Sequence, residues 1–177
     1  MTISALVQPL GGSRSHPYPL VCAGGLFLVL VGIAIVSGAL YSRWRAGFLG
    51  GGLIVASVAT AVATPRLVSG LGAPSRSQIV ALSAAVILEA ILIPLAVWAT
   101  RHRGESARWL VVFFMVGLHF LPMAVAFGPV VLVLGLAIML NTTVGLWRLT
   151  GMNLQFLWLT DGLLKVTAGV MMLLGVS

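Results

Sequence analysis

Two of the chain's three carboxylic acids, Glu89 and Asp161, lie inside long apolar stretches, as do His119 and Lys165. A charged side chain at the centre of a bilayer costs about 2.5–3.5 kcal/mol on insertion scales, so such residues usually have a function or a partner. A carboxyl group in an apolar pocket keeps its proton at neutral pH and can act as a general acid, while an imidazole can accept or relay the proton. Glu89, His119 and Asp161 are therefore candidate catalytic residues for proton transfer.

Neighbouring side chains are candidates for contact with a substrate. The ring faces of Phe113, Phe120 and Trp158 can stabilise a developing cation. Asn141 and Lys165 add an amide and an ammonium group within the apolar stretches. These five residues form the predicted substrate-binding set.

The same residues also have simpler structural interpretations. Trp158, Asp161 and Lys165 are spaced by three and four, so they share one helical stripe, and Asp161 with Lys165 can be a structural ion pair. His119 can be a core histidine bonded to a protonated Glu89, and Asn141 can simply link helices. Catalytic and structural roles both remain open at this point.

Several kinds of chemistry have no motif in the sequence. His16, His102 and His119 fall in three separate segments, so no metal-ligand spacing is present. There is no phosphate-binding glycine loop with its Lys-Ser/Thr pair and no nucleophile elbow. We expect no metal and no cofactor.

The elements that carry these residues follow from composition. Lys and Arg number 10 and Asp and Glu number 3 in 177 residues, of which 60% are hydrophobic, whereas about a quarter of a soluble domain is charged. The chain is predicted to be an all-α integral membrane protein, a six-transmembrane-helix bundle. We expect a flexible tail over residues 1–18 and one transmembrane domain over 19–177. The expected helices cover residues 20–40, 47–64, 79–99, 109–127, 129–147 and 154–174, with Pro65 ending the second.

Helices of these lengths bring the polar residues to one depth. Glu89 and His119 fall at the centres of the third and fourth stretches, and Asn141 and Asp161 lie slightly toward the predicted cytoplasmic side. At 1.5 Å per residue, all four fit a slab about 5 Å thick. We expect them to face the bundle interior around a shared hollow.

The basic residues predict the orientation. One side of the membrane receives Arg43, Arg45, Arg101, Arg103, Arg108 and Arg148, and the other receives Arg14, Arg66 and Arg76. The positive-inside rule then places both termini outside a multi-pass protein of the cell membrane. The net charge of +7 is scattered, so nucleic acid is not an expected partner. The expected partners are the lipid bilayer, a lipophilic small molecule and, in one interpretation, further copies of the chain.

Several strings resemble a family of small bacterial membrane proteins of unknown function. They are Val116-Gly117-Leu118-His119-Phe120-Leu121-Pro122, Phe127-Gly128-Pro129 followed by Leu134-Gly135, Asn141, and Trp158-Leu159-Thr160-Asp161-Gly162-Leu163-Leu164-Lys165. The resemblance covers residues 79–176 and implies several membrane helices without implying an activity. A much weaker likeness, in composition and chemistry only, is to membrane-bound terpene cyclases.

Three functions are compatible with these observations. The first is a membrane-embedded enzyme that protonates an alkene or epoxide of a lipophilic molecule, as in isoprenoid cyclisation or isomerisation. The second is a proton-coupled carrier, which needs an oligomer because 177 residues supply few helices for alternating access. The third is a structural or accessory membrane protein whose polar residues fix helix packing.

Overall fold

The computed structural model describes residues 17–69, 71–147 and 154–175, and the described part contains helices and no strands. The six long helices are α1 (Val21–Leu40), α2 (Arg45–Leu67), α3 (Arg76–Ala99), α4 (Glu105–Phe127), α5 (Pro129–Trp147) and α6 (Leu154–Leu173), with a short 3-10 turn, η2 (Ser42–Trp44), before α2. All six are long and apolar enough to cross a membrane. The chain is therefore an all-α, multi-pass membrane protein, as predicted.

The helix boundaries differ from the predicted ones mainly at starts. The helix α5 has the predicted bounds, and α1 and α6 differ by one residue at one end. The helix α3 begins three residues early because Ser75 and Gln78 form a capping box at its first turn. The helix α4 begins four residues early, at Glu105, whose carboxylate suits the positive end of a helix.

Pro65 does not end α2, contrary to the prediction. The helix starts at Arg45 and continues two residues past the proline, to Leu67. Pro65 sits in the last turn, where its missing N–H removes a single hydrogen bond, and the Thr64 hydroxyl donates to the carbonyl of Thr60.

Only the last two residues of the predicted tail lie within the described part, and both contact the bundle. The amide Nε2 of Gln78 donates to the carbonyl of Pro17 at 2.7 Å. The ring of Tyr18 lies against Gly128, which has a φ of +94° and forms the turn between α4 and α5. The rest of the predicted flexible tail lies outside the described residues.

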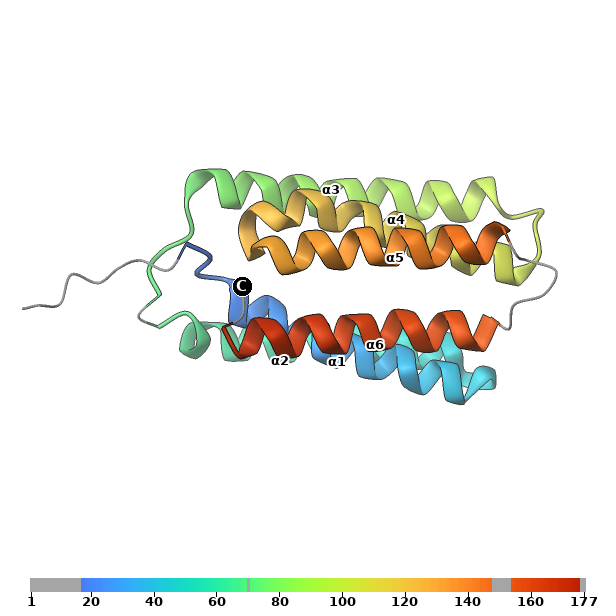
Figure 1. Cartoon of the computed structure of the whole chain (residues 1–177), viewed down its shortest axis with the longest axis horizontal. Coiled ribbons are helices and arrows are strands. Elements are labelled where there is room, and N and C mark those ends of the chain that lie inside the picture. The colour runs from blue at the N-terminus through green and yellow to red at the C-terminus, as the bar shows by residue number, and fades with distance from the viewer. Residues whose placement is uncertain (1–16, 70, 148–153, 176–177) are drawn as a thin grey trace, which may run out of the picture.

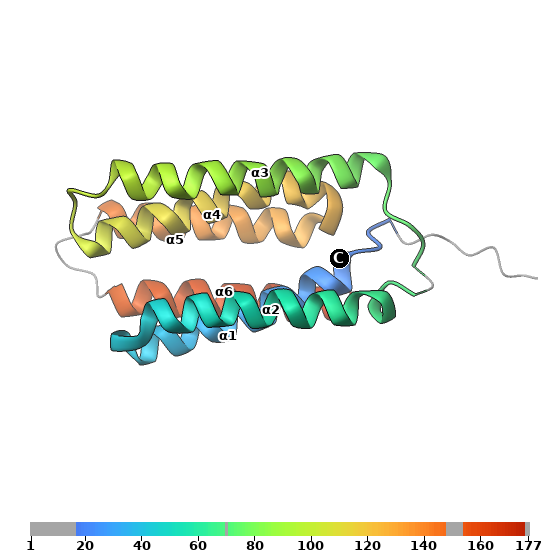
Figure 2. The ribbon, with the colours of Figure 1, turned by 180° about the vertical axis from the view of Figure 1, so that it is seen from behind.

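The helices form two layers of three (Figure 1). One layer contains α3, α4 and α5, and the other contains α1, α2 and α6. Along the resulting path of contacts, α2 packs on α1, α1 on α6, α6 on α5, α5 on α4 and α4 on α3. Seen from behind, α2 and α3 lie nearest the viewer at the two ends of this path (Figure 2).

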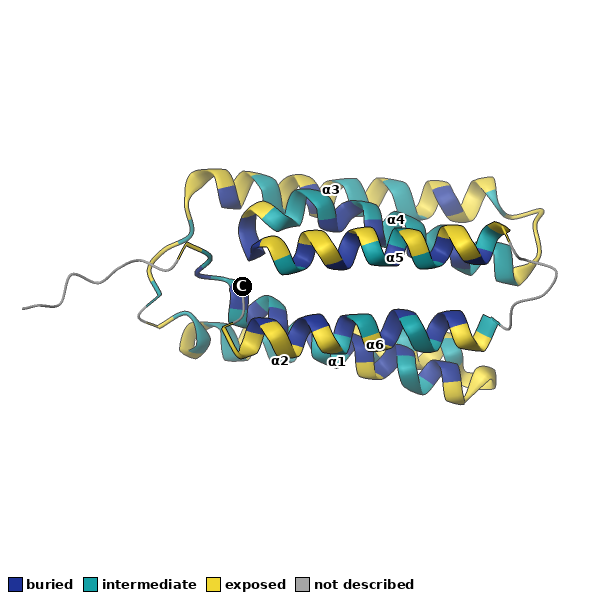
Figure 3. Ribbon diagram, viewed as in Figure 1, coloured by how far each residue is buried: buried dark blue, intermediate teal, exposed yellow. Residues whose placement is uncertain are grey.

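The outer position of α2 and α3 leaves their side chains largely uncovered, as the exposed residues along α3 show (Figure 3). In α2 only Ala56 is buried, and in α3 only Gln78, Ala85 and Ala96 are. Because the uncovered side chains are almost all apolar, these two helices suit contact with lipid.

The helices α1 and α6 pack through glycines. A Cβ atom added at Gly32 would lie 2.7 Å from the carbonyl oxygen of Gly162, and one at Gly162 would lie 2.9 Å from that of Gly32. Gly25 and Gly169 form the same kind of contact two turns away along the two helices. Small residues at such interfaces allow backbones to approach closely in membranes, and this packing fixes the face of α6 that carries the polar residues described next.

Candidate functional site

Glu89 and His119 face each other between α3 and α4. The imidazole Nε2 of His119 lies 3.5 Å from Oε2 of Glu89. This separation is within ion-pair range but longer than the 2.7–3.2 Å of a typical N–H···O hydrogen bond. The His119 side chain is 7% exposed and that of Glu89 is 37% exposed. The sequence-based expectation that the two residues share a depth is consistent with this contact.

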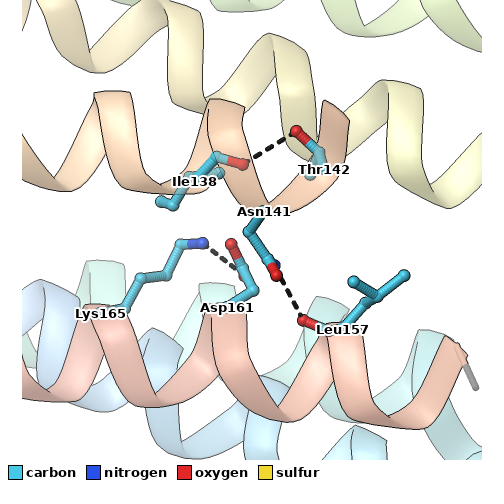
Figure 4. A network of polar contacts seen from close by, with 6 residues as sticks. All are labelled: Ile138, Asn141, Thr142, Leu157, Asp161 and Lys165. Atoms are coloured by element: carbon cyan, nitrogen blue, oxygen red, sulfur yellow. Dashed lines mark hydrogen bonds and ion pairs between the residues drawn. The ribbon is translucent and has the colours of Figure 1, made fainter. Parts of the chain in front are cut away.

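Asp161 and Lys165 form an ion pair within α6. The Nζ atom of Lys165 lies 2.5 Å from Oδ2 of Asp161, and the side chains are 2% and 0% exposed. Both point from α6 toward α5 (Figure 4). A buried carboxylate and ammonium compensate each other, which allows both to stay in an apolar interior.

The two pairs place four titratable side chains on three helices, α3, α4 and α6. These residues, Glu89, His119, Asp161 and Lys165, are hereafter called the titratable group. If Glu89 and His119 together hold one exchangeable proton, the whole group is neutral whichever of the two carries it.

Asn141 reaches from α5 toward α6 beside the ion pair, whereas the neighbouring Thr142 points away from α6 (Figure 4). The amide of Asn141 donates to the carbonyl of Leu157 on α6 at 3.2 Å. The buried hydroxyl of Thr142 donates within its own helix, to the carbonyl of Ile138 at 2.8 Å. Asn141 thus links α5 to α6 one turn from Asp161, as the structural interpretation predicts.

The predicted aromatic residues are buried in two places. Phe113 and Trp158 pack edge to face with ring centroids 4.9 Å apart, and Lys165 Nζ lies 5.7 Å from the Phe113 centroid. Phe120 packs on the imidazole of His119 at 4.5 Å. Because all three rings are buried, a ligand would reach them only after side chains move, and their substrate-binding role stays a prediction.

Three buried polar atoms in this region lack a well-aligned hydrogen-bond partner: Nδ1 of His119, Nε1 of Trp158 and Oδ1 of Asp161. Unpaired buried polar atoms are uncommon in proteins and often mark a functional position or a place for water. All three belong to predicted site residues.

A cavity of about 610 Å³ lies between α5 and α6, and no residue of the titratable group lines it. It is lined by Pro129, Val130, Val133, Leu134, Ala137, Leu164, Thr167, Ala168, Met171 and Gly175. None of Glu89, His119 and Asp161 lines it, so this is not the shared hollow expected around those residues. Within the titratable group, Glu89 is the residue with substantial exposure.

Sequence reasoning missed one contact at this site. The guanidinium of Arg45, at the start of α2, lies 5.6 Å from the ring centroid of Trp158. The sequence marks Arg45 only as a topology signal, because nothing in the spacing reveals that α2 and α6 approach each other at this end.

Comparisons with known proteins identify a family for this chain, but no activity is known for that family. The pattern of DUF6609, a family of unknown function, matches residues 13–176, which includes the resemblance found over residues 79–176 and extends it toward the N-terminus. No curated protein and no solved structure matches the chain. The likeness to terpene cyclases therefore has no support from these comparisons.

Proposed function

Because the chain belongs to DUF6609, a family of unknown function, we propose its activity from the site itself: it is a membrane-embedded enzyme that transfers protons to and from a lipophilic small molecule. The substrate reaches Glu89 from the bilayer. The observation that carries this proposal is the unequal exposure of the pair, with Glu89 open at 37% and its partner His119 closed at 7%.

The pair has the parts needed for acid and base catalysis. An imidazole whose hydrogen is on Nδ1 leaves Nε2 free to accept a proton from the Glu89 carboxyl group. The carboxyl hydrogen then lies between the two side chains, and moving it changes no net charge. This neutrality matters because separated charges are costly at this depth.

The reaction that fits this arrangement is a double-bond isomerisation. The Glu89 O–H protonates one carbon of an alkene, whose π electrons form the new C–H bond and leave a cation on the other carbon. The cation loses a proton from an adjacent carbon to the exposed Glu89 carboxylate, and the electrons of that C–H bond form the new double bond. The buried His119 does not touch substrate, and its Nε2, 3.5 Å from Oε2, orients the carboxyl group and shares its proton. One proton enters and one leaves, so the step needs no oxidant or reductant.

Asp161 and Lys165 act differently in this proposal. Both are almost fully buried and paired with each other, so they do not touch substrate. Lys165 acts at a distance, since a positive charge stabilises the Glu89 carboxylate left after proton donation. Asp161 is then a positioning residue that keeps Lys165 in place.

Deuterium uptake tests the proposal. The purified protein is placed in liposomes containing polyprenyl alkenes in D₂O, and the lipids are recovered for mass spectrometry. We expect deuterium in the alkene with the wild-type protein and with Glu105→Gln, which alters the carboxylate outside the apolar stretches. Glu89→Gln should abolish uptake while its thermal unfolding stays near that of the wild type. Uptake that is absent from the wild type, or equal in Glu89→Gln, would overturn the proposal.

A proton-coupled carrier is the second candidate, supported by the way the titratable group extends from α3 to α6. It predicts uptake of a solute into vesicles that stops when the pH gradient is collapsed. A purely structural role predicts instead that Glu89→Gln lowers stability without affecting either assay.

A further inference from the structure

Arginines gather at one end of the bundle, where α2 and α4 begin and α1 and α3 end (Figure 1). The described members are Arg43, Arg45, Arg101, Arg103 and Arg108. The carboxylate at this end is Glu105, and its Oε1 accepts a hydrogen bond from Trp109 Nε1 at 3.2 Å. Neither ion pair found among residues 17–69, 71–147 and 154–175 involves an arginine. This end therefore carries a positive charge that the described residues leave uncompensated.

Two of these arginines, Arg45 and Arg108, are half-buried, and Arg45 lies on an aromatic ring. Arg45 stacks over Trp158, and Trp158 packs edge to face on Trp109 with centroids 5.0 Å apart. Arg108 precedes Trp109 in the chain, and one of its terminal nitrogens donates to the carbonyl of Arg101 at 3.4 Å. The Nε atoms of Arg45 and Arg108 are buried and have no hydrogen-bond partner. Two half-buried guanidinium groups at this end of the bundle thus each keep one unused N–H donor.

We propose that Arg45 and Arg108 bind the phosphate of an anionic phospholipid headgroup. A guanidinium presents a planar fork of N–H donors that matches phosphate oxygens in a bidentate manner. The site lies at the ends of membrane-spanning helices, where headgroups are, and basic sites between such helices are known to recognise anionic lipids. Trp109, which is half-buried, adds an amphipathic ring that suits the same interface.

The other end of the bundle provides the contrast. Its described arginines are Arg66 in the last turn of α2 and Arg76 in the first turn of α3. Both are exposed and neither stacks on an aromatic ring in the described residues. These two arginines are matched controls, since they carry the same charge at the opposite membrane surface.

The test measures lipid-dependent stability of the full chain in detergent. Adding phosphatidylglycerol should raise the unfolding temperature by several degrees, because a ligand bound to the folded state stabilises it by mass action. Phosphatidylcholine and inorganic phosphate should not. Arg45→Gln and Arg108→Gln should each remove most of the increase, whereas Arg66→Gln and Arg76→Gln should retain it. Arg45→Lys, which keeps the charge but loses the fork, should retain only part of it.

Other outcomes would overturn the proposal. An equal increase with phosphatidylcholine would show a general detergent-replacement effect, and an equal increase with inorganic phosphate would show a free-anion site. Full retention in Arg45→Gln and Arg108→Gln would place lipid binding elsewhere. If a Gln variant proves too unstable to melt cleanly, native mass spectrometry counts retained phosphatidylglycerol, and undiminished retention there would equally contradict the proposal.

Discussion

Lys165 and Asp161 form a buried ion pair one turn apart on α6, with Nζ 2.5 Å from Oδ2. Removing one partner of such a pair leaves an uncompensated charge and costs about 3–5 kcal/mol, whereas replacing both partners is often close to neutral. We expect Asp161→Asn and Lys165→Met each to lower the unfolding free energy by that amount. The double variant should recover most of the loss, as measured by unfolding in mixed micelles. A double variant no more stable than the singles would show that the pair does not act as a unit.

Gly32 is predicted to tolerate no added methyl group. A Cβ there would lie 2.7 Å from the backbone oxygen of Gly162 and 2.7 Å from a methyl group of Val166, so Gly32→Ala should lower stability by about 1–3 kcal/mol through overpacking. Gly50 of α2 has no atom within 4 Å of such a Cβ. Gly50→Ala is the control and should leave stability unchanged or raise it by up to about 1 kcal/mol, since alanine favours helices. Equal effects of the two substitutions would contradict the close α1–α6 packing.

Asn141 is expected to hold α5 against α6. Asn141→Leu removes the hydrogen bond to the Leu157 carbonyl, and interhelical hydrogen bonds in membranes contribute about 0.6 kcal/mol on average and about 1.7 at most. Thr143→Val is the control, because its hydroxyl is exposed and donates within α5, to Met139. In chemical unfolding, Asn141→Leu should lower the unfolding free energy more than Thr143→Val does. A larger loss of stability in Thr143→Val would exclude Asn141 as an interhelical link.

The orientation predicted from the arginine distribution has a direct test. The chain has a single cysteine, Cys22, so a Cys22→Ser background allows one new thiol to be placed in each loop. A membrane-impermeant thiol reagent should label Ala73→Cys on intact cells and His102→Cys only after permeabilisation. The opposite pattern of labelling would reverse the orientation.

The sequence predicted the helices well because the bilayer sets their length and composition. Its errors arose where local capping overrides hydropathy, as at Ser75 and Gln78, or where a proline falls in a last turn, as at Pro65. Both effects depend on single hydrogen bonds, which an average over about 20 residues does not register.

The sequence predicts which residues of the candidate site pair with each other, but it does not predict which side chains surround the pairs. The spacing of Asp161 and Lys165 on one helix fixes their contact, and equal depth brings Glu89 to His119. The exposure of Glu89 and the stacking of Arg45 on Trp158 depend on which helices are neighbours. That order of neighbours, with α6 placed between α1 and α5, is not encoded in any local pattern.

The glycine contacts between α1 and α6 have a consequence for biosynthesis. During translation α1 enters the bilayer before α6 does, so α1 at first lacks the helix with which it packs most extensively. The glycine face of α1 is covered only after α6 has been inserted, and the final packing of the bundle is therefore a late step of biosynthesis.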